Sequence, residues 1–299
     1  MSTGPRTRRP PCRLLLPLLL AAALACSPPR TAADEGMLAH APSPPRPRLA
    51  LVLDDLGWSE RSAGRVVALP GPVTLAVLPE TPVGAAVAER GHAAGHEIIL
   101  HQPMTPTLPV DPGPRSLSPD MDGRALRRTV LANLDALPHR VGLSNHMGSL
   151  LTSLPDSMDA MMEAIAPRGV YFLDSRTTPD SVAARSARAH AIPTVARDVF
   201  LDVVIDRRLI AAALERAVRL AEEQGHAVAI GHPHAATLDV LEARLPALRS
   251  RVRLVTVSEL VAPAAAPRWA KGPEATGARP AVPARRRTRG GRTGAALGE

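Results

Sequence analysis

The segment LALVLDDLG, residues 49–57, joins a continuous apolar run to two adjacent carboxylates, Asp54 and Asp55. An uninterrupted apolar run of this length is typical of a parallel β-strand that is buried on both faces. Polar residues that follow such a strand lie at its carboxyl end, which is where α/β proteins build their ligand sites. The segment therefore predicts the fold class and the place of a functional site together.

Similar apolar runs recur through the middle of the chain and alternate with helical patterns. We expect strands at Leu49–Leu53, Val73–Leu78, Glu97–Leu100, Val141–Leu143, Val170–Leu173, Val195–Leu201, Ala227–Ile230 and Arg253–Val257. We expect helices at 82–94, 120–136, 156–166, 207–224 and 235–248. This alternation predicts an α/β domain over 49–262, and the number of units favours a distorted (β/α) barrel of about seven parallel strands over an open sheet.

The positive charge of the chain is concentrated outside this domain. The 299 residues carry a formal net charge of +8, of which residues 1–48 contribute +5 and residues 263–299 contribute +6. The domain itself is therefore mildly acidic, which argues against a nucleic-acid groove. Only five residues are aromatic, too few for rows of base-stacking platforms. Composition predicts that 263–299 is a disordered basic tail, with contact to an anionic membrane or wall polymer as the alternative.

The N-terminus has the parts of an export signal. Arginines precede the apolar run LLLPLLLAAAL (14–24), which is too short to span a bilayer, and small residues follow it. We interpret residues 1–25 as a signal peptide and 26–48 as a Pro-rich tether. Cys26 directly after the signal indicates either a lipid-anchored lipoprotein or a plain secreted product, and an uncut membrane anchor is a third alternative. The protein is expected to be exported, as a periplasmic or membrane-anchored protein.

The two cysteines restrict the chemistry available to the domain. Both Cys12 and Cys26 lie near the N-terminus. A disulfide framework and a thiolate zinc site are therefore excluded from the body of the protein. Any metal in the domain has to be bound by imidazole and carboxylate groups.

Histidine and aspartate side chains follow several of the expected strands. His101 directly follows the apolar run EIIL (97–100), and Asn145 and His146 follow VGLS (141–144). His232 directly follows AVAIG (227–231). In a barrel these strand ends converge on one face. Asp55, His101 and His146 then form a set suited to a divalent metal, zinc first, and Asp54 stays free as a general base. Other histidines, such as His92 and His139, are interpreted as solvated residues of helix ends and turns.

Seven segments carry a resemblance to a known family. They are LVLDDLG (51–57), VTLAVLPETP (73–82), GHEIILHQPM (95–104), SNHMGSLLT (144–152), YFLDSRTTP (171–179), RDVFLD (197–202) and AIGHPH (229–234). Together they resemble the divergent polysaccharide deacetylases, an exported bacterial family, over about residues 49–261. The resemblance implies a distorted barrel whose metal-dependent site hydrolyses N- or O-acetyl groups of a glycan.

The resemblance also implies roles for individual residues. Asp54 matches the catalytic base of the larger superfamily, Asp55 its metal-binding carboxylate, His101 its first metal-binding histidine and His232 its general acid. The superfamily's second histidine is replaced by Thr105.

The superfamily's arginine-proline-tyrosine element is also replaced, by the segment 145–149, which reads NHMGS. We infer that His146 within this segment supplies the missing ligand.

Further polar residues accompany these strand ends. Arg197 and Asp198 are expected to orient His232 or to hold substrate, and Asp174, Ser175 and Arg176 to bind sugar hydroxyls, with Asn145 beside them. The alternative is an ion-pair network that braces the rim of the barrel.

Three functions remain open at this point. The first is an exported metal-dependent deacetylase of an acetylated glycan. The second is a catalytically silent barrel that binds a cell-envelope glycan or a protein partner. The third is a related hydrolase of a different amide or ester. Loss of the second histidine favours the latter two, whereas the Asp54–Asp55 pair and His232 favour retained chemistry.

Overall fold

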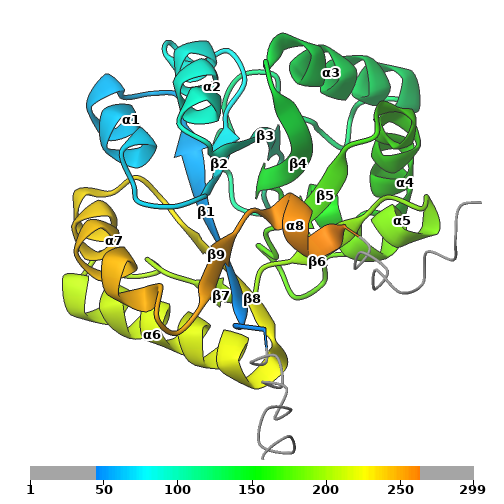
Figure 1. Cartoon of the computed structure of the whole chain (residues 1–299). Coiled ribbons are helices and arrows are strands. Elements are labelled where there is room, and N and C mark those ends of the chain that lie inside the picture. The colour runs from blue at the N-terminus through cyan, green and yellow to red at the C-terminus, as the bar shows by residue number, and fades with distance from the viewer. Residues whose placement is uncertain (1–44, 263–299) are drawn as a thin grey trace, which may run out of the picture. The chain divides into compact units, whose positions relative to one another are not determined.

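The computed structural model describes residues 45–262, and those from Arg46 onward belong to one compact unit. The sequence segments interpreted as the signal peptide, nearly all of the tether and the basic tail lie outside the described residues. Within 45–262 the chain forms one all-parallel, curled sheet with helices packed around it (Figure 1). The alternation of strands and helices predicted a distorted (β/α) barrel, and this curled parallel sheet with its helices confirms that fold class. No helix in this range is long and apolar enough to cross a membrane.

The strands of the sheet and the helices follow one another along the chain in regular alternation. The strands are β1 (Arg48–Leu56), β2 (Thr74–Val77), β3 (Glu97–Met104), β4 (Arg140–Met147), β5 (Tyr171–Asp174), β6 (Thr194–Ala196), β7 (Val199–Phe200), β8 (His226–Gly231) and β9 (Arg253–Val255). The helices are α1 (Glu60–Val67), α2 (Gly84–Ala93), α3 (Gly123–Ala136), α4 (Pro155–Ile165), α5 (Ala183–Ala189), α6 (Arg207–Gln224), α7 (Ala235–Leu248) and α8 (Val257–Val261). The five expected helices are present, and α1, α5 and α8 were not expected from the sequence.

The helix boundaries follow from local capping. Asp206 begins α6, because its side chain accepts hydrogen bonds from the N–H groups of Arg208 and Leu209. Gly225 ends the same helix in the left-handed conformation (φ 82°), which glycine adopts without steric penalty. Ser59 caps α1 in the same way as Asp206 caps α6. These helix ends are thus fixed by residues visible in the sequence.

The sheet runs in the order β6-β5-β4-β3-β2-β1-β8-β7, so its two edges are β6 and β7. These two strands were expected to be one strand, Val195–Leu201, and that prediction is wrong. The N–H of Arg197 donates to the Asp174 carbonyl on β5, whereas the N–H of Asp198 donates to the Val228 carbonyl on β8. One short segment therefore supplies both edge strands and joins the two edges of the curled sheet, pairing with β5 on one side and with β8 on the other.

Strand β1 lies in the middle of this arrangement (Figure 1). Its first half pairs with β9, its second half pairs with β2, and β8 pairs along its opposite edge. The expected strand Arg253–Val257 is shorter than predicted, because Thr256 caps α8 and Val257 is its first residue. The first strand of the domain thus pairs with its last two strands, β8 and β9.

The sheet has an apolar core on each of its two faces. The larger core lies between the sheet and the surrounding helices, whereas the smaller one contains alternate residues of the strands together with residues of α8. Side chains along a strand alternate between faces. Ala50 and Val52 of β1 belong to the inner core, and Asp54 is next on that face; Ile230 of β8 is likewise followed by His232. The alternation that fills the barrel therefore also aims these polar residues into it.

A buried carboxylate occupies the opposite end of the barrel. Glu97 accepts hydrogen bonds from the hydroxyls of Tyr171 (2.7 Å) and Thr74 (2.9 Å) and from the N–H of Ser258 in α8. Burial, and then the neighbouring Glu97 charge, hold the pKa of Tyr171 well above its usual value. Its hydroxyl therefore stays protonated and donates. This network joins four segments of the chain beneath the inner core.

The ring of Tyr171 leaves no room for a side chain at Gly142. A Cβ atom at that position would lie 2.5–2.7 Å from ring atoms of Tyr171. We expect Gly142→Ala to lower the free energy of unfolding by about 1–3 kcal/mol, the usual cost of overpacking a core. Gly64→Ala is the control: Gly64 lies within α1 with no atom near its Cβ position, so alanine should stabilise by about 0.5–1 kcal/mol. Urea unfolding measures both; an unchanged Gly142→Ala protein would contradict this packing.

Candidate metal and catalytic site

A cavity of about 460 Å³ opens at the carboxyl ends of the strands. It is lined by Asp54, Asp55, His101, Asn145, His146, Met147, Ser175, Arg176, Thr177, Arg197, Phe200, Ile230 and His232. The structure therefore brings together all five residues proposed to bind metal or move protons. Strands β1, β3 and β4 supply four of them, and His232 directly follows β8.

Three of these side chains converge on one point. Oδ1 of Asp55 lies 2.7 Å from Nδ1 of His146 and 3.2 Å from Nε2 of His101. One ligand atom from each residue falls within 4.8 Å of the others. Asp55 has a left-handed backbone (φ 58°), which turns its side chain into the cavity directly after the inward-facing Asp54. This is how two consecutive carboxylates face one site.

The environment of this cluster fits a divalent ion. Oδ1 of Asp55 is buried and makes no hydrogen bond to any residue of 45–262, although two imidazole nitrogens face it. Burial alone would raise the pKa of Asp55, but the lowering by the two imidazoles outweighs this effect. The net pKa lies below the ordinary value, so the carboxylate is ionised. Nδ1 of His101 lies 2.7 Å from the Ser144 hydroxyl, which leaves Nε2 directed at the cluster. One carboxylate and two imidazoles are ligands that zinc accepts.

Asp54 lies beside this cluster in a different environment. It is almost fully buried, and its Oδ1 has no hydrogen-bond partner among the described residues. Its Oδ2 lies 3.5 Å from Nε2 of His101. Burial raises the pKa of Asp54 above its ordinary value, although the surrounding imidazoles oppose the shift. A carboxylate whose pKa is raised in this way is better suited to accept a proton near neutral pH than an exposed one.

His232 faces the cluster from β8 and is held by Asp202. Nδ1 of His232 lies 3.0 Å from Oδ1 of Asp202, and the other Asp202 oxygen accepts from the His232 N–H and from the Thr237 hydroxyl. Nε2 of His232 is therefore the nitrogen that faces the cavity, 3.8 Å from Oδ2 of Asp55. Although burial lowers the pKa of His232, the carboxylates of Asp202, Asp55 and Asp54 raise it to about 9. This group carries a proton at neutral pH.

Asp202 is the functional residue to which the sequence analysis gave no role. It follows the apolar residues of VFLD, the same strand-end signal that marked Asp54. Its pairing with His232 could not be read from the sequence, because the pair depends on how β7 aligns with β8. Asp202, His232 and His234 also form a three-residue cluster, but the Asp202 oxygens are already used in hydrogen bonds. The cluster therefore orients His232.

Removing the Asp202 carboxylate should change the titration of His232. In metal-free protein we expect His232 to titrate with a pKa of about 9, and Asp202→Asn to lower that pKa, because the Asp202 hydrogen bond is lost while the Asp54 and Asp55 charges remain. Wild type keeps the associated stability below about pH 6.5 and loses it as pH rises toward 9, and the variant loses less. Asp198→Asn is the control, since Asp198 bonds the Val228 N–H instead. NMR titration of the ring protons tests this; equal titration in all three proteins would contradict the assignment.

Two of the expected supporting residues do not line the cavity. The carboxylate of Asp174 accepts hydrogen bonds from the Arg176 N–H (2.8 Å) and the Ser181 hydroxyl (2.9 Å). That of Asp198 accepts from the Val228 N–H (2.8 Å). Both groups hold backbone and loops in place. Their geometry corresponds to the bracing alternative, although as polar contacts to the backbone and a hydroxyl rather than as an ion-pair network.

The remaining supporting residues line the cavity and also brace it. Asn145 accepts from the Ser175 N–H (2.9 Å), and Arg197 donates to the carbonyl oxygens of Ser175 and Arg176. The guanidinium of Arg197 also lies over the Phe200 ring, 5.0 Å from its centre. Substrate contact by these residues stays a prediction.

Thr105 lies where the superfamily pattern has its second histidine, and here it has a structural contact. Its hydroxyl donates to the Leu117 carbonyl (3.0 Å), and it does not line the cavity. His146, on the neighbouring strand, supplies the imidazole beside Asp55 instead. This arrangement supports the inference that His146 replaces the missing ligand.

A curled parallel sheet with carboxylate and imidazole groups gathered at its strand ends defines a deacetylase-like α/β barrel. The chain belongs to the divergent polysaccharide deacetylase family, whose family model matches residues 51–261.

Relatives of known sequence or structure share this domain. The uncharacterized protein YibQ of Escherichia coli K12 is 35% identical over 214 residues, which are 72% of this chain and 67% of that protein. An uncharacterized protein of Haemophilus influenzae is 30% identical over 213 residues, 71% of this chain and 76% of its own length. The crystal structure of the uncharacterized protein ATU2773 from Agrobacterium tumefaciens C58 has a similar fold, with a TM-score of 0.69 and 23% identity over 73% of this chain and 90% of that one.

Proposed function

We propose that this chain is an exported, metal-dependent hydrolase that removes N- or O-acetyl groups from a cell-envelope or extracellular glycan. The observation that carries the proposal is the convergence of Asp55, His101 and His146 on one point, with Asp54 and His232 beside them in the same cavity. A binding module needs neither a base nor an acid at that point. Family membership supports an acetylated carbohydrate as the substrate class.

The three converging residues would hold the ion, zinc first among the candidates. A divalent ion bound there supplies Lewis-acid polarisation of a carbonyl oxygen and lowers the pKa of a coordinated water toward about 7. The protein fixes the ligand geometry through the Ser144 contact to His101 and the left-handed backbone of Asp55.

Two residues of the chain move protons in this proposal. Asp54, whose pKa is raised by burial, accepts the proton of the attacking water. His232, protonated at neutral pH, donates the proton on Nε2 to the leaving amine or alkoxide. Asp202 keeps Nδ1 of that imidazole occupied, so Nε2 is the nitrogen that faces the substrate. The surroundings of the carboxylate and of the imidazolium thus give the two groups opposite roles, one as proton acceptor and the other as proton donor.

Acetate release by metal-loaded protein tests the proposal. The substrates are peptidoglycan, chitin-type oligosaccharides and an acetylated exopolysaccharide. Acetate from at least one of them is the expected result. Metal-loaded wild type that releases none from all three would instead favour the silent glycan- or partner-binding barrel, and turnover of only non-carbohydrate amides or esters would favour the related hydrolase.

Export rests on the sequence of residues 1–26. We propose a periplasmic protein, anchored through lipid on Cys26 or released after cleavage. Mass spectrometry of the mature N-terminus distinguishes the two: a lipid-modified cysteine indicates anchoring, whereas an unmodified cut product indicates release. An intact N-terminus recovered from the cytoplasm would contradict export.

A further inference from the structure

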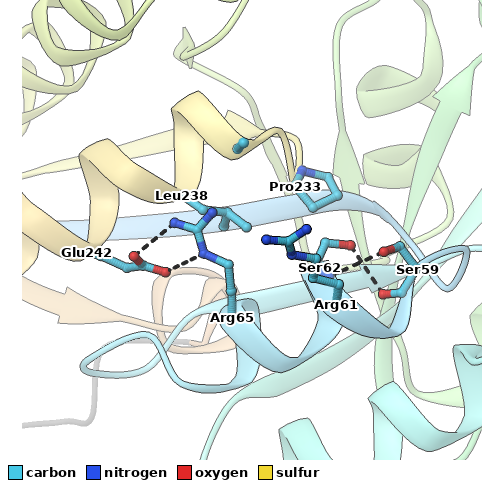
Figure 2. A pocket seen from close by; sticks show the side chains of 8 residues that line it. Ser59, Arg61, Ser62, Arg65, Pro233, Leu238 and Glu242 are labelled. Atoms are coloured by element: carbon cyan, nitrogen blue, oxygen red, sulfur yellow. Dashed lines mark hydrogen bonds and ion pairs between the residues drawn. The ribbon is translucent and has the colours of Figure 1, made fainter.

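A second cavity of about 610 Å³ lies between α1 and α7, outside the site described above (Figure 2). The residues that give it its chemical character are Ser59, Arg61, Arg65, Pro233, Leu238 and Glu242. The hydroxyls of Ser59 and Ser62, two guanidinium groups, one carboxylate and apolar side chains form its walls. This mixture suits a sugar ring, which has polar edges and apolar faces.

This cavity adjoins the catalytic one through two loops. Asp55 lines the catalytic cavity, and Ser59, a few residues later in the β1–α1 loop, lines the second. On the other side, His232 lines the catalytic cavity and Pro233 lines the second. Consecutive Cα atoms are about 3.8 Å apart, so a polymer held at the first cavity has its next unit within reach of the second.

The two arginines that line the cavity differ in how they are paired. Arg65 donates to both oxygens of Glu242 (2.8 Å each) and to Asp239 (2.7 Å), so its charge is balanced. Arg61, one helical turn earlier, makes no ion pair or side-chain hydrogen bond with any of the described residues 45–262. Figure 2 shows both guanidinium groups extending from α1 toward α7. Arg61 is therefore the cation of this cavity that remains available to a ligand.

We propose that the cavity between α1 and α7 is a subsite for an acidic unit of the same glycan, whose carboxylate is bound by Arg61. One free guanidinium matches one carboxylate in charge and can bind it through two parallel hydrogen bonds. The inference rests on the proposed function and narrows it: the substrate is an acetylated polymer that carries carboxylates and spans two cavities.

Direct binding to metal-free protein tests the subsite without turnover. The probes are a hyaluronan tetrasaccharide, which carries N-acetyl groups and carboxylates, and chitotetraose, which carries N-acetyl groups alone. Wild type should bind the charged probe about tenfold more tightly, the effect of one charge-assisted hydrogen-bond pair. Isothermal titration calorimetry at low salt measures both affinities. Equal affinity of wild type for the two probes would overturn the proposal.

Variants at position 61 test whether Arg61 causes the tighter binding of the carboxylate-bearing probe. Arg61→Ala should lose the preference, and Arg61→Glu should reverse it. The glutamate substitution lies in the first turn of α1, where a negative charge is favourable to the helix, so the fold is not at risk. Arg128→Ala, which removes another exposed arginine on α3, should keep the wild-type preference. Retention of the preference in Arg61→Ala would overturn the proposal.

Acetate release separates failure of the subsite from failure of the function. If wild type releases acetate and Arg61→Ala keeps the wild-type KM on carboxylate-bearing substrates, the subsite is wrong and the proposed function stands. If wild type shows the Arg61-dependent preference but releases no acetate, the subsite stands and the catalytic proposal is wrong. The subsite alone predicts a higher KM with an unchanged kcat for Arg61→Ala on carboxylate-bearing substrates.

Discussion

His146→Ala protein is expected to lose most of its bound divalent metal. The substitution removes the imidazole whose Nδ1 lies 2.7 Å from Oδ1 of Asp55, and leaves two ligands. Even groups that only orient metal ligands typically change metal affinity by about 10–100-fold, so a direct ligand should cost at least as much. Elemental analysis after dialysis gives occupancy, and competition with a chromophoric chelator gives affinity.

His92→Ala is the matched control, because it removes an imidazole outside the cavity. His92 is exposed on α2 and stacks on His139, with 3.9 Å between ring centres. Its replacement should leave the metal content unchanged, and alanine suits a helical position. Equal metal in wild type and His146→Ala would remove His146 from the site and reopen the question of the missing ligand.

Asp54→Asn should keep the metal and lose turnover. Asparagine has the size of aspartate but cannot accept the proton, while Asp55 and the two histidines are unchanged. General bases typically contribute about 10²–10⁴-fold to a rate, so acetate release should fall by at least about 10²-fold. The measurement is kcat for acetate release by protein whose metal content has been verified.

Two further variants serve as comparisons for the assignment of Asp54 as the base. Asp120→Asn makes the same chemical change at an exposed loop carboxylate and should retain full activity. His232→Ala should also retain metal, with its greater loss on substrates whose leaving group is an amine, because an amine needs the proton more. Full activity of metal-loaded Asp54→Asn would assign the base to another group.

Much of the fold could be predicted from the sequence because buried parallel strands carry a strong signal. The runs that became β1, β3 and β8 are apolar on both faces, and their order with the helices indicated the barrel. The short helix α5 (Ala183–Ala189) was missed because it is too brief to show periodicity. The segment 195–201 looked continuous, because local sequence cannot show that adjacent residues bond to different strands.

In the candidate site, too, local features could be predicted from the sequence, whereas contacts between distant segments could not. Asp54, Asp55, His101 and His232 were visible because each follows an apolar run of sequence, a local feature. The partnership of Asp202 with His232 depends on three-dimensional alignment and had no local signal.

The supporting residues show the same limit. Asp174 and Asp198 carried the strand-end signal, yet their carboxylates are occupied by backbone and hydroxyl donors. Strand-end position therefore indicates where a side chain lies, and the surrounding hydrogen bonds decide what it does.

The central place of β1 has a consequence for the order of folding. Strand β1, the first strand of the described residues, is paired along one edge with β8 and in its first half with β9, strands made near the end of the domain. Contacts between distant parts of a chain close slowly, and an unpaired strand edge invites pairing with other chains. A chain that stops before His226 keeps the strand bearing Asp54 and Asp55 open on that edge. Asp54 and Asp55 are thus set in place only when the last strands of the barrel arrive.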